Sequence, residues 1–175
     1  MGFCVPKSIE MIFPKRNVRI PAVLLEKEAP ETCEAVWSVL TESDDPSSLK
    51  NWPENGATHH AKWVGPEIFV FLPQGKKRPP VENSTYRPIP GDIMLFLIPE
   101  KKQYAVKIPG EQWDFAVFYD RGANLKAEVP NVEDEGWKGS RFAKVPNVHL
   151  DALLDVGNKI SFEGTEPMLV RRLPA

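Results

Sequence analysis

The stretch THHAKWVGPEIFVFL, residues 58–72, decides the fold that we expect for this chain. Its pattern predicts two short strands that a Gly-Pro pair interrupts, with apolar residues on both faces of each strand. His60, Trp63 and Glu67 stand among those apolar residues. A polar group held inside an apolar strand needs a partner. We therefore predict that this stretch lies within a β structure and contributes to a ligand site.

Strand alternation separates the two adjacent histidines of this stretch. Neighbouring residues of a strand point to opposite faces, so His59 and His60 point apart and are poorly placed to bind one metal ion together. The chain also has no glycine-rich motif of the kind that cradles phosphates. We therefore predict neither a metal site nor a cofactor.

The carboxyl group of Glu67 has two alternative surroundings. Alternation places Glu67 on the same face as Phe69 and Phe71. Either the carboxylate lies at a strand end and reaches solvent, or it lies inside a cavity with a partner. In the second case burial raises the pKa of Glu67, unless a donor such as His60 or Arg121 pairs with it. The sequence leaves both alternatives open.

Length and composition indicate one ordinary soluble domain. A chain of 175 residues, 42% hydrophobic and 26% charged, is long enough for a single domain, which we place at residues 1–175. Its 18 prolines favour turns and strand edges over long helices. The formal net charge of -2 gives no electrostatic reason to expect nucleic acid or an anionic membrane as a partner.

The N-terminal residues and the cysteines predict a cytoplasmic location. The opening sequence MGFCVPKSIEMIF lacks the uninterrupted apolar core of a secretion signal, and no segment approaches the run of about 18 apolar residues that spans a membrane. Cys4 and Cys33 could form at most one disulfide. Cys33 lies on the apolar side of a predicted helix, where a free thiol behaves as a small hydrophobic group.

The other elements are expected to be mostly strands. An apolar stripe at helical spacing, beginning behind Pro30, predicts a helix over residues 29–40 that packs one face on a sheet. Alternating or apolar patterns predict strands at 9–13, 18–25, 93–98, 104–108, 115–119 and 141–145. The C-terminal part predicts a short helix at 148–155 that Gly157 ends, and then a closing hairpin of 158–162 and 167–173.

A proline-rich segment, residues 73–92, predicts a long loop, and long loops of compact domains often carry function. Within it, Glu82 and Asn83 either hydrogen-bond a ligand or bond local backbone groups that hold the turn. Tyr119 ends a later predicted strand and offers an amphipathic ring with a hydroxyl group. We take these three residues as further candidates for the site.

Two parts of the sequence resemble known families. The run AVLLEKEAPETCEAVWSVL, residues 22–40, resembles the start of a cyclophilin, with an apolar strand followed by a Pro-x-Thr helix start. The downstream segments HAKWVGPEIFVFLP, ENS, PGD and FAVFY resemble a bacterial family of uncharacterised proteins with a cyclophilin-like fold. This second resemblance implies a small, closed, antiparallel β-barrel with one or two short covering helices, and it implies no established activity.

The chain departs from the cyclophilins that isomerise prolyl bonds. Those enzymes carry an arginine that donates hydrogen bonds to the prolyl amide, in an FHR-like strand, followed by a Phe-Met-x-Gln stretch. Here no arginine stands between His59 and Gln74, and the Met-x-Gln segment is missing. We therefore do not expect peptidyl-prolyl isomerase activity.

The sequence supports two main hypotheses about function. In the first, the chain is a binding module that holds a small polar or carboxylated ligand at the mouth of the barrel. In the second, the same pocket is that of a small-molecule hydrolase or isomerase, in which Glu67 or His60 is the general base. A homo-oligomeric assembly could accompany either hypothesis. The residues predicted to form the pocket are His60, Trp63, Glu67, Glu82, Asn83 and Tyr119.

Overall fold

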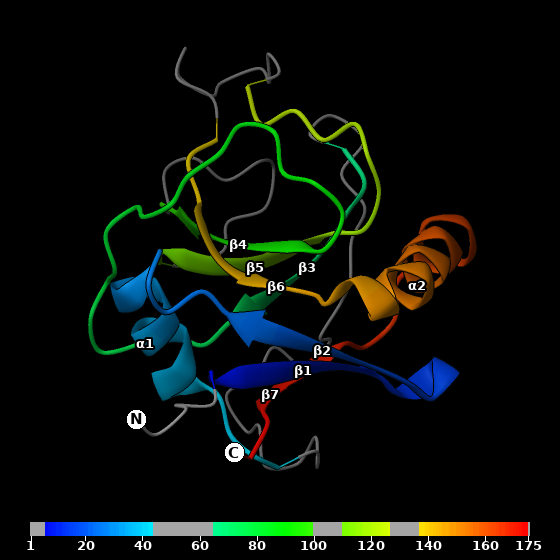
Figure 1. The fold of residues 1–175 in the computed structure, drawn as a ribbon, viewed down its shortest axis with the longest axis horizontal. Helices are drawn as coiled ribbons and strands as arrows, with labels where there is room; N and C mark the ends of the chain where they lie inside the picture. Colours follow the sequence, from blue (N-terminus) through cyan, green and yellow to red (C-terminus); the bar gives the residue numbers. More distant parts are fainter. Residues whose placement is uncertain (1–5, 44–64, 100–109, 127–136, 175) are drawn as a thin grey trace.

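The computed structural model describes residues 6–43, 65–99, 110–126 and 137–174. Within these ranges the chain forms mainly β structure with two α-helices (Figure 1). The strands are β1 (Ser8–Phe13), β2 (Val18–Leu24), β3 (Glu67–Leu72), β4 (Asp92–Ile98), β5 (Gln112–Phe118), β6 (Ser140–Lys144) and β7 (Leu169–Arg172). The helices are α1 (Pro30–Val39) and α2 (Leu150–Glu163), with 3-10 turns at Pro14–Arg16 and Asn147–His149.

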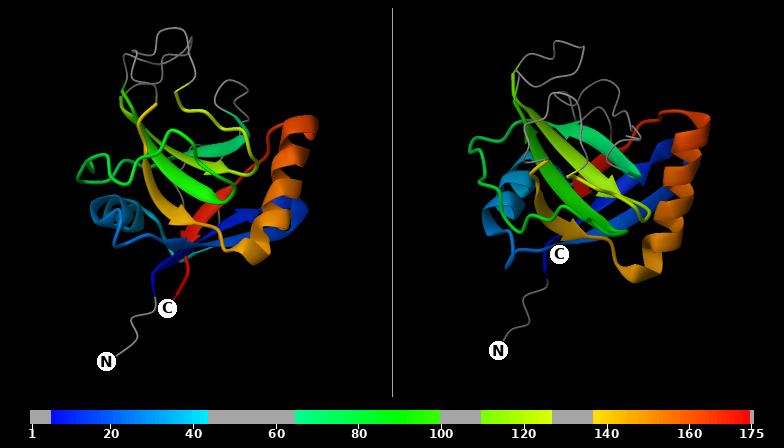
Figure 2. Two further views of the ribbon diagram at one scale, coloured as in Figure 1. Left: turned by 45° about the horizontal axis from the view of Figure 1, so that its top comes forward. Right: turned by 90° about the horizontal axis from the view of Figure 1, so that it is seen from above.

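The seven strands form one antiparallel sheet in the order β3-β5-β4-β6-β2-β1-β7. The expectation of a closed barrel is wrong for the described part of the chain, because β3 and β7 are the two outer strands and do not pair with each other. The sheet instead curls into an open half-barrel (Figure 2). The expected mainly β fold with covering helices is confirmed. Helices α1 and α2 lie at opposite ends of the half-barrel (Figures 1 and 2), and both contribute side chains to the main core.

The junction between β2 and β6 explains the shape. These strands pair through only two residue pairs, Val23 with Lys144 and Leu24 with Ala143. By contrast, β1 pairs with β2, and β5 with β3 and with β4, through six residue pairs each. The short junction lets the sheet turn, so that β3-β5-β4-β6 and β2-β1-β7 enclose side chains between them. Packing between the two halves takes the place of hydrogen bonds between the outer strands.

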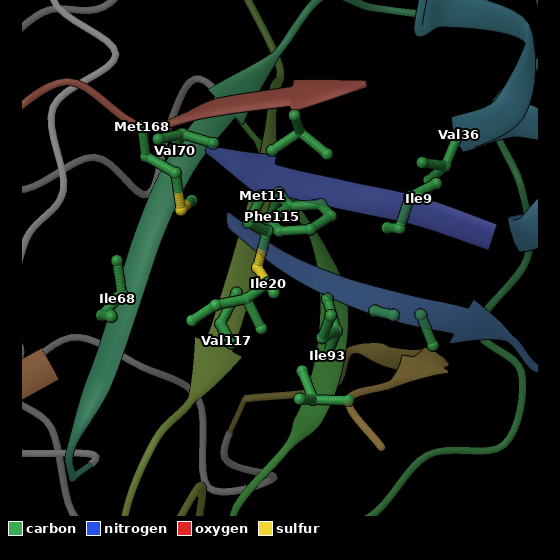
Figure 3. Packing of buried hydrophobic residues seen from close by; sticks show 14 of the residues in the cluster. Ile9, Met11, Ile20, Val36, Ile68, Val70, Ile93, Phe115, Val117 and Met168 are labelled. Carbon is green, nitrogen blue, oxygen red and sulfur yellow. The ribbon is translucent and has the colours of Figure 1, made fainter. Parts of the chain in front are cut away.

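The main core fills the space between these halves. Side chains of β3, β4 and β5 meet those of β1 and β2 there, and α1 adds its apolar face (Figure 3). The residues seen in the interior are Ile9, Met11, Ile20, Val36, Ile68, Val70, Ile93, Phe115, Val117 and Met168. All of them are almost completely removed from solvent, and burial of this kind is the main source of stability in a domain of this size.

Strand β3 confirms the alternation predicted for the second half of the central stretch. Its even-numbered residues Ile68, Val70 and Leu72 are buried in the main core. Its odd-numbered residues therefore project from the other side of the sheet, which we call the outer face. A second apolar cluster lies on this outer face; its buried members are Met94, Phe96, Ala116, Phe118, Ala123 and Leu125. The first half of the central stretch, residues 58–64, lies outside the described residues.

The predicted C-terminal elements were wrong in one respect. Helix α2 runs on through Gly157 to Glu163, so that the predicted strand 158–162 is helical. Gly157 does not end the helix; it lies inside it and is buried against the ring of Tyr119. Strand β7 consequently has no partner at 158–162 and pairs with β1 instead. The glycine marks a close approach between a helix and the sheet, which a sequence signal for a helix end does not distinguish.

Helix α1 lies where the sequence placed it. Cys33 and Val36 are buried on its inner face, and the Cys33 thiol donates a hydrogen bond to the carbonyl oxygen of Phe142 in β6. Burial raises the pKa of Cys33 from 9.0 to about 12, so this free thiol stays protonated and acts as a core group. Cys4 and the predicted strand 104–108 lie outside the described residues.

Candidate functional site

Glu67 is the first residue of β3 and lies on the outer face of the sheet, in register with Phe118 of β5. It exposes only 7% of its surface. Burial in the first place, and the negative charge of Asp114 in the second, raise the pKa of Glu67 well above its usual 4.5. The carboxyl group therefore lies at the end of a strand, as in the first alternative, but it is buried there and does not reach solvent.

Asp114 is a second acidic residue on the same face. It belongs to β5, and its register partners are Phe71 in β3 and Phe96 in β4. Its Oδ1 atom is buried and has no hydrogen-bond partner among the described residues. Burial raises the pKa of Asp114 from 3.8 to about 8, so a proton is bound to this carboxyl group at neutral pH for most of the time.

The sequence analysis missed Asp114, although a signal for it was present. Alternation along the predicted strand 115–119 extends backwards, and it puts Asp114 on the same face as Ala116 and Phe118. An aspartate in that position stands between Trp113 and the apolar run Phe115–Phe118. The same argument that singled out Glu67 therefore applies to Asp114.

Aromatic and small side chains fill the face between the two acids. Phe69 and Phe71 follow Glu67 along β3, and their ring centroids lie 5.6 Å apart at an interplanar angle of 57°. Ala116 is the register partner of Phe69 and is completely buried. We call these five residues, Glu67, Phe69, Phe71, Asp114 and Ala116, the acidic face. Its two carboxyl groups stand four residues apart along the strands, or roughly 13 Å between Cα atoms.

Glu82 is engaged at the start of α1. Its Oε2 atom accepts hydrogen bonds from the backbone N–H and the hydroxyl group of Thr32, both at 2.7 Å, and its Oε1 atom accepts one from the N–H of Glu31 at 3.3 Å. The residue before the helix is Ala29, whose side chain cannot cap it. A carboxylate 50 residues further along the chain therefore satisfies the free N–H groups of this helix and complements its dipole.

The Glu82→Ala substitution is expected to lower the free energy of unfolding by about 2 kcal/mol, because the helix start loses a charged acceptor for three hydrogen bonds. Urea unfolding measures this loss. Glu28→Ala serves as a control, since Glu28 is exposed just before the same helix and a change there is expected to stay within about 0.5 kcal/mol. An equal loss in both variants would contradict the capping role.

Asn83 holds the long loop against β6. Its backbone has a positive φ of 46°, a conformation that asparagine tolerates better than most residues. Its Nδ2 atom donates to the carbonyl oxygen of Arg141 at 2.9 Å, and its Oδ1 atom accepts from the guanidinium group of Arg141 at 3.2 Å. Both ends of the amide are thus bonded to a residue of β6 that is 58 positions away, whereas the sequence suggested bonds to local backbone groups or to a ligand.

Tyr119 lies under α2. Its ring belongs to the main core and covers Gly157, and its hydroxyl group hydrogen-bonds Ser161, one helical turn further on. Burial raises the pKa of this hydroxyl group. The backbone N–H of Tyr119 donates to the carbonyl oxygen of Pro66, at 3.1 Å, close to the start of β3. The ring itself is part of the interior rather than of the acidic face.

The structure therefore does not bring the predicted pocket residues together as one group. Glu67 lies on the outer face, Glu82 and Asn83 lie where the loop meets α1 and β6, and Tyr119 lies in the main core. His60 and Trp63 lie outside the described residues. Alternation along β3 correctly put Glu67 on the same face as Phe69 and Phe71 but left its burial open. The role of Glu82 depends on a contact with a helix distant in sequence.

The described residues also bear on metal binding, on surface grooves and on membrane spans. No group of three or more histidine, cysteine, aspartate or glutamate side chains there is placed to hold a metal ion. An open groove lies between α1 and residues 74–79; it is lined by Pro30, Glu31, Glu34, Ala35, Ser38, Val39, Gln74, Gly75, Lys76, Lys77 and Pro79. Of the predicted pocket residues that the structure describes, none lines this groove. None of the helices in the described ranges combines the length and the apolar character that a membrane crossing requires.

The chain is similar in sequence to one protein family and in structure to several solved proteins. A family model for proteins of unknown function matches residues 11–170. The comparison with curated proteins gives no match. Among solved structures, the chain is similar to McbB in complex with tryptophan, with a TM-score of 0.55 and 18% identity over 95% of this chain and 45% of that one. The chain thus spans less than half the length of McbB.

Two other solved structures are similar at lower scores. One is the solution structure of the hypothetical protein AF2241 from Archaeoglobus fulgidus, with a TM-score of 0.47 and 17% identity over 99% of this chain and 100% of that one. The other is the crystal structure of the Mimivirus cyclophilin, with a TM-score of 0.46 and 16% identity over 95% of this chain and 86% of that one. At these identities the likeness concerns the fold alone.

Proposed function

Because the chain belongs to the DUF3830 family of proteins of unknown function, its activity has to be argued from its own residues, and we propose that it binds a small polar ligand on the acidic face. The family membership confirms the resemblance inferred from the downstream segments of the sequence. The bacterial origin, the cytoplasmic location and the homo-oligomeric assembly remain predictions.

The observation that carries the proposal is the unpartnered Oδ1 atom of Asp114 beside the buried carboxyl group of Glu67. Removing a carboxyl group from water without a hydrogen-bond partner costs several kcal/mol. A buried carboxyl oxygen without a partner, on the same sheet face as a second buried carboxyl group, is therefore expensive for the fold alone. A ligand that bonds to both would recover this cost, and the rings of Phe69 and Phe71 would supply its apolar contacts.

The other predicted pocket residues have different parts in this proposal. The polar groups of Glu82 and Asn83 are already bonded to α1 and β6, so we assign them to the support of the long loop. Tyr119 is assigned to the attachment of α2. His60 and Trp63 remain predicted contributors to the site, on the evidence of the sequence alone.

Catalysis of proton transfer is the second candidate function. A carboxyl group is an effective general acid or base when its pKa lies near the working pH, and Asp114 has a pKa of about 8. In this alternative Glu67 and Asp114 exchange a proton with the bound molecule. Turnover of the bound molecule distinguishes this alternative from simple binding. The Asp114→Asn substitution would abolish turnover, while the affinity for a neutral substrate would change by no more than about threefold.

Binding is tested with isotope-labelled protein and a set of small polar compounds of positive, neutral and negative charge. We expect saturable changes in the backbone amide signals of Phe69, Phe71 and Ala116. At about pH 9, where Asp114 is largely ionised, the affinity is expected to fall at least about tenfold in Asp114→Asn, through loss of a charged hydrogen bond. Asp151→Asn is the matched control, since Asp151 is exposed on α2. Binding that is confined to the groove beside α1, or that is equal in all three proteins, would refute the proposed site.

A further inference from the structure

Most buried acidic residues of the described part of the chain have a basic partner, and those of the acidic face do not. The buried acidic residues in the described ranges are Glu10, Glu67, Asp92 and Glu166, and three of these four have a basic partner. Glu10 binds both Arg19, at 3.1 Å, and Arg171, at 2.8 Å. Arg16 binds Glu166 at 2.8 Å, and Arg141 and Lys144 lie 3.6 and 4.0 Å from Asp92.

Glu67 and Asp114 differ because no ion pair of the described residues includes them. The three paired acids receive their cations from neighbouring strands or turns. Directly opposite Glu67 and Asp114 the neighbouring strands carry Phe118, Phe71 and Phe96, none of which has a charge. The described residues therefore build a place for positive charge on this face without supplying the charge themselves.

The neighbouring side chains indicate what kind of cation fits. A metal ion needs several oxygen or nitrogen ligands, and the described residues contain no group of three that could provide them. A carboxylate pair beside phenyl rings instead suits an organic cation, because a cation is attracted to the face of an aromatic ring as well as to a carboxylate. The protein uses such contacts elsewhere: Lys7 lies 5.4 Å, and Arg172 5.3 Å, from the ring of Trp37.

We propose that the ligand of the acidic face is an organic cation, an amine or a quaternary ammonium compound, whose charge lies between Glu67 and Asp114 and whose carbon atoms contact Phe69 and Phe71. The inference rests on the proposed function and narrows its ligand class. The sequence suggested a polar or a carboxylated ligand. The inference disfavours a carboxylated ligand without a positive group, because its carboxylate would lie beside the carboxylates of Glu67 and Asp114 and be repelled by them.

The test uses three probes of similar size and different charge: benzyltrimethylammonium, benzyl alcohol and benzoate. Each is titrated into labelled protein at about pH 9, above the pKa of about 8 of Asp114, so that this carboxyl group is largely ionised. The quaternary ammonium probe has no proton to lose. We expect it to shift the amide signals of Phe69, Phe71 and Ala116 and to bind at least about tenfold more tightly than either other probe.

The variants Glu67→Gln and Asp114→Asn separate charge from shape, because the amides retain the size of the acids. Each is expected to reduce the affinity for benzyltrimethylammonium at least about tenfold, whereas Asp151→Asn is expected to leave it unchanged. If benzyl alcohol or benzoate binds the acidic face as tightly as the cation, the site stands and the ligand class is wrong. If none of the three probes shifts the signals of this face, the proposed function fails together with the inference.

Discussion

Replacing Gly157 by alanine is expected to lower the free energy of unfolding by about 3 kcal/mol, although alanine is the better helix former by about 1 kcal/mol. A Cβ atom at this position would lie 2.3 to 2.6 Å from three atoms of the Tyr119 ring. Those atoms belong to the part of the ring nearest the backbone, so the ring cannot move aside without disturbing β5 and the main core. Urea unfolding measures the loss.

Two comparisons make this result specific to the contact between α2 and Tyr119. Asn158→Ala, at an exposed position of the same helix, is expected to change the stability by no more than about 0.5 kcal/mol. In a Tyr119→Ala background the clash is absent, so Gly157→Ala should become neutral or stabilising there. A loss of the same size in both backgrounds would mean that the glycine is needed for another reason.

Asp114→Asn is expected to make the protein more stable at alkaline pH, by several kcal/mol at about pH 9. The pKa of Asp114 is raised from 3.8 to about 8 in the folded state, so the folded protein holds its proton more tightly than the unfolded chain does. The resulting stabilisation is complete below about pH 4 and is lost as the pH rises through about 8, at roughly 1.4 kcal/mol per pKa unit. Asparagine cannot ionise and avoids this loss.

The measurement is the free energy of unfolding of wild type and variant at several pH values across this range. The two proteins should differ little in acid and diverge as the pH rises. Glu67→Gln should act in the same direction, because the pKa of Glu67 is also raised by burial, and Asp151→Asn should follow the wild type. A variant that is less stable than the wild type at every pH would show that the Asp114 carboxylate has a partner in the folded protein.

The features of the fold that depend on neighbouring residues of the chain could be predicted from the sequence. Strand alternation separates the two faces of β3 whatever its neighbours are, so Glu67 was correctly placed on one face with Phe69 and Phe71. The pattern did not tell which face enters the main core, and the structure shows that it is the face of Ile68 and Val70. Helix α1 has an apolar stripe and a proline suited to a first turn. The apolar run of β4 indicated a strand with neighbours on both sides, and β5 and β6 flank it.

The features that were not predicted depend on contacts between distant residues. Closure of a barrel requires β3 and β7 to meet, which no local pattern reports. The capping of α1 by Glu82 joins residues 50 positions apart. Gly157 carries the same local signal whether it ends a helix or allows a ring to approach one. Glu67 was recognised because it stands in a stretch with several unusual residues, whereas Asp114 requires the same reasoning to be applied to every strand.

The junction between β2 and β6, which has only two residue pairs, limits how far the stabilisation from a bound ligand would extend through the sheet. The acidic face belongs entirely to β3 and β5, on one side of that junction, whereas β1, β2 and β7 lie on the other. Ligand binding stabilises directly only the cooperative unit that contains the site. Slower hydrogen exchange on addition of a ligand would thus be greatest in β3, β4 and β5, and would reach β1 and β7 chiefly through side-chain packing in the main core.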